Sequence, residues 1–165
     1  MLKFTNSSIV FQELPNEVTL AINIAGCPNK CVGCHSSFLQ EDIGEDLTYE
    51  KLEDLIRNND GITAVCFMGG DSQPQYINLF AGYLYARFPD IRVGWYSGRS
   101  EIYLDVIYCF FDYIKIGPYI PEFGPLNNPK TNQKLFKVTH PNGYMQKPKL
   151  IDITSSFWNN HKFGQ

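Results

Sequence analysis

The sequence lacks the long apolar segments of a membrane protein. Among its 165 residues, no run approaches the ~18 consecutive apolar residues of a membrane-spanning helix. The N-terminal stretch "MLKFTNSSIVFQELPNEV" interrupts its apolar residues with Asn, Ser, Gln and Glu, so it has no apolar centre of the kind found in signal peptides. These absences predict a cytoplasmic protein with no membrane partner.

The sequence also has little net charge and no cluster of basic residues. Its 14 Lys and Arg against 17 Asp and Glu give a formal net charge of −3. A protein that binds nucleic acid or an anionic membrane presents a surplus of positive charge to the phosphates. No Lys/Arg run supplies such a surplus here, so we predict no nucleic-acid partner.

Strand-like and helical patterns alternate along the chain, which predicts a single α/β domain over residues 1–165. The strand-like runs cover residues 18–26, 62–71, 91–98, 112–120 and 133–138, and the helical patterns cover residues 46–61, 74–89 and 100–111. Such alternation is typical of βα units with a mostly parallel sheet. The chain is shorter than the ~250 residues of a full eight-fold barrel, so we expect a partial barrel or an open parallel sheet.

Three loops follow strand-like runs and are therefore expected on one edge of the sheet. They are the cysteine-rich loop after residue 26, the turn Gly69-Gly70-Asp71 and the turn Tyr96-Ser97-Gly98. In parallel sheets, function collects in the loops at the carboxyl ends of the strands. Residues 117–132 hold four prolines without a helical period, and such a long loop is often functional.

Five cysteines are present, and three of them are crowded into the stretch "GCPNKCVGCH". A disulfide framework normally uses an even and dispersed set, so the cluster Cys27-x3-Cys31-x2-Cys34 indicates metal or redox chemistry. Pro28 and Gly33 favour a loop over a helix for this stretch. The remaining two, Cys66 in a strand and Cys109 in a helix, are expected to pack in the core.

Two kinds of metal site fit three clustered thiolates. A structural zinc site needs four ligands in a closed tetrahedron. His35 would be the fourth, although it follows Cys34 directly, and Cys66, Cys109 or His140 are more distant candidates. A four-iron cluster normally has four cysteine ligands. With only three, one iron keeps an open position, and an open position favours a catalyst.

The spacing Cys27-x3-Cys31-x2-Cys34 resembles the signature of the radical S-adenosylmethionine (radical SAM) superfamily. The resemblance implies a [4Fe-4S] cluster whose fourth iron is chelated by the amino and carboxylate groups of SAM. One electron from the cluster then cleaves SAM to methionine and a 5′-deoxyadenosyl radical. The cluster and SAM therefore carry the chemistry, and no side chain is expected to be catalytic. The implied fold is a shortened radical SAM β/α barrel with its core at about residues 19–138 and a tail at residues 139–165.

Gly69-Gly70-Asp71 resembles the superfamily's "GGE" element, which meets the amino end of SAM through its backbone and acidic group. Asp71 stands where Glu is usual, and Ser72-Gln73 stands where Pro often follows. By themselves, the Gly-Gly pair and the stretch Tyr96-Ser97-Gly98 would each indicate only a turn. The residues that the resemblance implies for cofactor binding are Gly33, Cys34, His35, Gly69, Gly70, Asp71 and Ser97.

The length and residues 112–138 narrow the resemblance to the activating protein of the anaerobic ribonucleoside-triphosphate reductase. Members have an Asp, a strand that ends in Gly-Pro, and a loop that ends in an Asn-Gln pair with a basic residue, here Asn132-Gln133-Lys134. This resemblance implies that the radical is passed to a glycine of the large reductase subunit. An external electron donor such as flavodoxin is expected, because no second cluster motif is present.

Other functions stay open from the sequence. Within the same chemistry, the chain would activate another glycyl-radical enzyme or act on a small molecule such as a deazapurine precursor. From a different class, it would be a non-catalytic zinc or iron–sulfur binding module. Tyr119, Phe123 and Tyr144 lie in expected loops, where exposed aromatic side chains would suit a protein partner.

Overall fold

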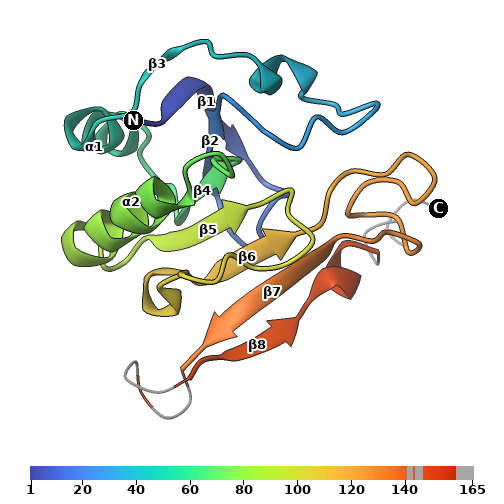
Figure 1. The fold of residues 1–165 in the computed structure, drawn as a ribbon. Helices are drawn as coiled ribbons and strands as arrows, with labels where there is room; N and C mark the ends of the chain where they lie inside the picture. Colours follow the sequence, from blue (N-terminus) through green and yellow to red (C-terminus); the bar gives the residue numbers. More distant parts are fainter. Residues whose placement is uncertain (141–142, 144–146, 159–165) are drawn as a thin grey trace, which may run out of the picture.

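An eight-stranded mixed sheet runs through the molecule in the order β3-β1-β2-β4-β5-β6-β7-β8 (Figure 1). The computed structural model describes residues 1–140, 143 and 147–158, so Tyr144 and residues 159–165 of the expected tail lie outside the described residues. The strands are β1 (Lys3–Val10), β2 (Thr19–Ile24), β3 (Glu45–Asp46), β4 (Ala64–Met68), β5 (Arg92–Tyr96), β6 (Tyr113–Ile116), β7 (Lys134–Thr139) and β8 (Lys149–Asp152). The sheet is open, with β3 and β8 at its edges.

The sheet is parallel at its centre and antiparallel at its flanks. β2, β4, β5 and β6 pair in parallel, whereas β1 and β3 on one side and β7 and β8 on the other pair antiparallel. The predicted parallel pairing of strands therefore holds for the four central strands only. The flanks differ because turns and loops join these segments, and antiparallel strands need no crossover helix.

Two helices cover one face of the central strands (Figure 1). α1 (Tyr49–Arg57) begins after Thr48, whose Oγ1 accepts a hydrogen bond from the Lys51 N–H at 3.1 Å, as expected for an N-cap. α2 (Pro74–Arg87) has Pro74 in its first turn, where the missing N–H costs nothing. Both helices bury apolar stripes in the larger core cluster, against side chains such as Phe67.

The opposite face of the same strands packs in a second, smaller core cluster. Its fully buried members are Leu14, Ala64, Cys66 and Leu135, with Tyr113 nearly so. Successive residues of a strand point to opposite faces, so Val65 joins the helical side while Cys66 faces away from it. The expected core position of Cys66 is confirmed.

The prediction of a helix at residues 100–111 is wrong. The chain there forms a loop that contains the 3-10 helix η2 (Tyr108–Phe110), and Cys109 is partly exposed in it. Asn78 of α2 supplies the reason, because its Nδ2 donates to the Asp105 carbonyl at 2.8 Å and its Oδ1 accepts from the Ile107 N–H at 3.1 Å. These contacts occupy backbone groups that a helix would use.

Other segments differ from expectation in smaller ways. β1, with the sequence KFTNSSIV, has no long apolar run, because polar residues separate its apolar ones, and the sequence patterns therefore did not predict it. The described part of the expected tail forms β8 and the 3-10 helix η3 (Thr154–Phe157). No helix within the described part of the chain is long and apolar enough to cross a membrane.

Glu53 joins the two helices through a charged hydrogen-bond group. Its carboxylate accepts from the Tyr83 hydroxyl at 2.5 Å, from Arg87 Nε at 3.0 Å and from Arg57 Nη2 at 3.3 Å. The Tyr83 hydrogen bond and the Arg87 guanidinium lower the pKa of Glu53 from 4.5 to about 2, since both favour the ionised form. The carboxylate therefore stabilises the folded state when it is ionised.

Glu53→Gln should reduce the free energy of unfolding at every pH above 4.5, where the wild-type carboxylate is ionised in both states. Because the folded pKa is depressed, this contribution is lost as the pH falls from 4.5 towards 2. The difference between wild type and variant should therefore shrink over that interval. Urea unfolding curves across the interval measure it, with the exposed Glu101→Gln as control; a constant difference would contradict the assignment.

Candidate functional site

A cavity of about 290 Å³ lies at the carboxyl ends of the central parallel strands. Strand ends of β2, β4, β5 and β6 contribute to its wall, because the carboxyl ends of parallel strands meet at one edge of the sheet. Several residues singled out from the sequence line this one cavity: Cys27, Cys31, Cys34, His35, Gly69, Asp71 and Ser97. The three expected loops therefore meet, as their positions after strands predict.

Gly33 and Gly70 are the two expected cofactor-binding residues that lie outside the cavity lining. A side chain on Gly33 would meet Tyr119 and Pro121 of the long loop, each at 3.6 Å. Gly70 has φ +91, and a Cβ there would lie 2.5 Å from Ile77 Cδ1. Gly70 therefore permits close packing of α2 against the end of β4.

The cysteine loop leaves β2 and runs to the 3-10 helix η1 (Ser37–Gln40) without helical structure, as Pro28 and Gly33 predict. Gly26 and Gly33 have φ +72 and +69, values in the left-handed region that suit glycine. The Cys27 N–H donates to the Leu39 carbonyl at 2.8 Å, which ties the start of the loop to η1.

All three cavity thiols are free and partly exposed. Within residues 1–140, 143 and 147–158, no three His, Cys, Asp or Glu side chains converge as ligands of a single metal ion. A four-iron cluster places less demand on convergence, because its thiolates bind different irons. The cysteine loop carries three thiols to one cavity, which is three of the four thiolate ligands that such a cluster normally has.

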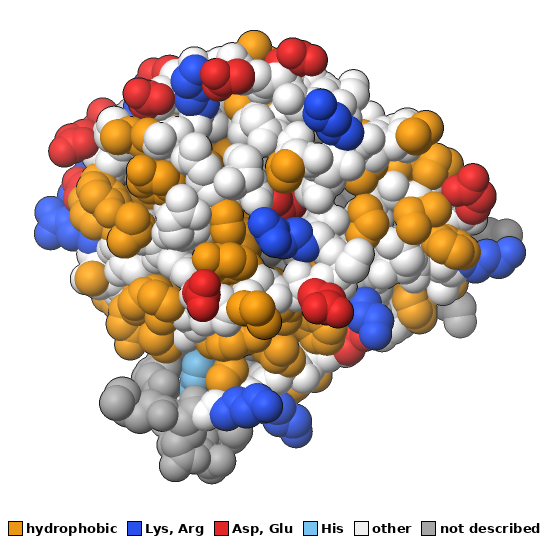
Figure 2. Space-filling view, in the orientation of Figure 1, with side chains coloured by type: hydrophobic (Ala, Val, Ile, Leu, Met, Phe, Trp, Pro, Cys, Tyr) orange, Lys and Arg blue, Asp and Glu red, His pale blue; other side chains and the backbone are white. Residues whose placement is uncertain are grey.

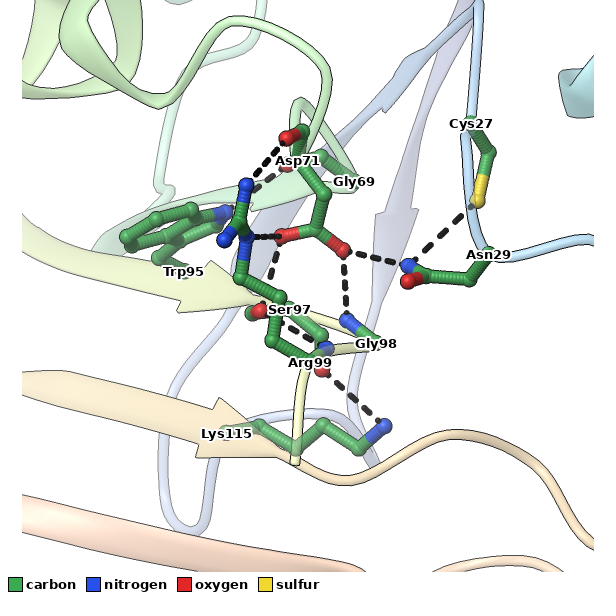
Figure 3. Close-up of polar contacts among 9 residues, drawn as sticks. All are labelled: Cys27, Asn29, Gly69, Asp71, Trp95, Ser97, Gly98, Arg99 and Lys115. Atoms are coloured by element: carbon green, nitrogen blue, oxygen red, sulfur yellow. Dashed lines mark hydrogen bonds and ion pairs between the residues drawn. The ribbon is translucent and has the colours of Figure 1, made fainter. Parts of the chain in front are cut away.

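Asp71 lies at the centre of the hydrogen-bond network beside the thiols (Figure 3). Its Oδ2 accepts from Asn29 Nδ2 and from the Gly98 N–H, and its Oδ1 accepts from Ser97 Oγ, all at 2.7 Å. Arg99 Nε lies 3.9 Å from Oδ1, and Arg99 Nη2 donates to the Asp71 carbonyl at 2.9 Å. The Asp71 side chain is only 1% exposed, so these donors replace the water that a buried carboxylate loses.

Lys115 of β6 brings a buried positive charge to the same cavity (Figure 3). Its Nζ donates to the Gly117 carbonyl at 2.7 Å and to the Ser97 carbonyl at 3.4 Å. It forms no ion pair with any carboxylate of the described residues. Burial lowers the pKa of Lys115 to about 8, while the charges of Asp71 and the thiols act in the opposite direction.

Sequence analysis missed Lys115 and Asn29. A single lysine within the apolar strand "DYIKIG" was a usable signal, because a lysine is rarely buried without a reason. Asn29 carried no such signal, since its partner Asp71 is 42 residues away in the sequence.

The long loop at residues 117–132 contributes to the cavity through Gly117 and Tyr119. Gln133, at its end, is nearly buried and also lines the cavity, while Asn132 Nδ2 donates to the Pro118 carbonyl at 2.9 Å. The Asn-Gln pair thus closes the loop and reaches the cavity. Phe123, on the same loop, is 44% exposed.

Cys66 should resist alkylation in the native, metal-free protein, whereas Cys27, Cys31 and Cys34 should react. Burial of Cys66 raises the pKa of its thiol, and the thiolate is the nucleophile. Native labelling with iodoacetamide, followed by peptide mass spectrometry, measures the four rates. Labelling in denaturant is the control, in which all should react; native labelling of Cys66 at the rate of Cys31 would contradict its burial.

Comparisons of the chain with protein-family models, with curated proteins and with solved structures gave no match.

Proposed function

We propose that this chain is a radical SAM activase that generates a glycyl radical on the anaerobic ribonucleoside-triphosphate reductase. Cys27, Cys31 and Cys34 would hold a [4Fe-4S] cluster, and SAM would occupy the remaining cavity. One observation carries the proposal: three thiols with the Cys-x3-Cys-x2-Cys spacing face a single cavity at the carboxyl ends of parallel strands. The cavity also holds a buried lysine and a buried aspartate.

The side chains of the cavity have separate roles in this proposal. When bound, the cluster and SAM would supply a 5′-deoxyadenosyl radical that takes a hydrogen atom from a glycine. Lys115 would present its positive charge to the carboxylate group of SAM, because its buried ammonium lines the cavity. Cys34, His35, Gly69 and Ser97 line the cavity and would supply further contacts to the ligand.

A protein substrate is supported by the surface around the cavity. Val32 lies between two of the cysteines and is 81% exposed, and Phe38 and Phe123 are exposed on segments next to the cavity lining. On the face shown in Figure 2, Lys and Arg side chains lie among acidic and apolar ones and form no basic patch. Exposed apolar side chains of this kind suit a protein partner better than a nucleic acid.

The remaining parts of the proposal follow from the resemblance. The open α/β sheet would be a shortened radical SAM barrel, and the reductase would complete the wall that a longer chain would supply itself. The protein would act in the cytoplasm, where a donor such as flavodoxin would deliver the electron.

SAM cleavage tests the proposal directly. The anaerobic protein, reconstituted with iron and sulfide and reduced with dithionite, should release 5′-deoxyadenosine from SAM. Cys31→Ala should not, because a thiol ligand is missing, whereas Cys66→Ala should, because Cys66 lies in the core away from the cavity.

If the isolated protein forms a cluster but does not cleave SAM, the assay is repeated with the reductase. The glycine substrate of the reductase would then complete the site. Absence of cleavage with the reductase present would refute the activase proposal. A colourless protein that binds one zinc ion would identify a binding module instead.

Lys115→Met should weaken SAM binding to the reconstituted protein about tenfold, the lower range for losing a hydrogen bond between two charged groups. Met keeps the length of the side chain without its charge. Binding of 5′-deoxyadenosine should not change, because this ligand has no carboxylate. Isothermal titration with both ligands measures the effect, with Lys137→Met at an exposed position of β7 as the matched control. Equal weakening of both ligands would rule out carboxylate recognition.

A further inference from the structure

The Asp71 carboxylate makes its contacts within the protein itself. A carboxylate accepts about four hydrogen bonds, and three short ones reach Asp71 from Asn29, Ser97 and Gly98. The Arg99 guanidinium stands beside the remaining side of Oδ1 at 3.9 Å. With its side chain 1% exposed, Asp71 has little surface left for a ligand.

The three donors come from two segments of the chain (Figure 3). Asn29 lies in the cysteine loop after β2, between Cys27 and Cys31, while Ser97 and Gly98 form the turn after β5. Asp71 itself follows β4, the strand that lies between β2 and β5 in the sheet. Its carboxylate is therefore the point at which the loops of three adjacent strands are joined.

Asn29 continues this connection to a thiol. Its Nδ2 donates to Asp71 Oδ2 at 2.7 Å and also lies 3.8 Å from Cys27 Sγ, within hydrogen-bond range for sulfur. Gly98 leaves the space for this arrangement, because a Cβ at that position would lie 2.4 Å from Asn29 Nδ2. The side chain of Asn29 is thereby fixed between the carboxylate and the sulfur.

We propose that Asp71 is a positioning residue, which holds the cysteine loop against the β5 turn through Asn29 and so fixes the direction of Cys27. This role differs from contact with the amino group of SAM, which the resemblance implies for the residue at this position. The positioning role rests on the proposed function in one respect only, namely that the loop carries the cysteines that would hold the cluster. The shorter Asp side chain in place of Glu suits a contact with the protein's own loop.

Amide hydrogen exchange of the reduced, metal-free protein tests the proposal, read residue by residue by NMR. In Asp71→Ala, the amides of Gly98, Cys27 and Cys34 should exchange at least about tenfold faster, the factor expected for losing hydrogen bonds to a charged acceptor. In Asn29→Ala, only the two cysteine amides should accelerate. Gly98 should keep its protection, because its acceptor on Asp71 remains.

Two further variants separate positioning from general stability. Asp71→Asn keeps one acceptor oxygen for Asn29 and Gly98, so its exchange rates should lie nearer wild type than those of Asp71→Ala. Asn78→Ala removes a pair of partly buried hydrogen bonds on α2, outside the cavity. It should leave the cysteine amides unchanged relative to the rest of the sheet.

Unchanged cysteine amides in Asn29→Ala would overturn the proposal, even where Asp71→Ala fails to fold. Equal acceleration of all amides of the sheet in Asp71→Ala would also overturn it, because Asp71 would then serve stability alone. Neither result depends on a cluster or on SAM. Failure of the positioning role is therefore distinguishable from failure of the activase proposal, which SAM cleavage decides.

Discussion

The burial of one carboxylate constrains the whole edge of the sheet where the cavity lies. An ionised Asp71 can be buried only if donors replace its water, and the structure supplies them from the cysteine loop and from the turn after β5. The loops after β2, β4 and β5 are held together as a result. The position of the thiols relative to the strand ends thus depends on Asp71, which contacts the cysteine loop through Asn29.

The parallel centre of the sheet makes this junction geometrically available. β2, β4 and β5 are neighbours and run in one direction, so their loops leave from the same edge. The two core clusters hold these strands from opposite faces, with the helices on one side and Leu14 and Leu135 on the other. A packed sheet that carries its functional residues on the loops at the strand ends is the arrangement that binding sites in α/β proteins commonly use.

The cavity combines charges of both signs with thiols at short range. The Asp71 carboxylate is surrounded by hydrogen-bond donors. Lys115 Nζ contacts two backbone carbonyl groups and lies over the Tyr96 ring, and it faces the space that a ligand would occupy. A buried ammonium without a carboxylate partner is costly, which is why such groups concentrate at functional sites. The cavity therefore places a buried ammonium and three thiols within one space.

The sequence by itself determined the cysteine spacing, the α/β class, the helices α1 and α2, and the arrival of three loops at one edge, because hydrophobic period and turn residues are local signals. The helix predicted at residues 100–111 does not form, and the Asn78 side chain instead hydrogen-bonds to the backbone groups of Asp105 and Ile107. The partners of Asp71 and the burial of Lys115 were decided only by the tertiary structure. Contacts such as Asn29 to Asp71 join residues far apart in the chain, and no local pattern records which distant donor will meet a buried charge.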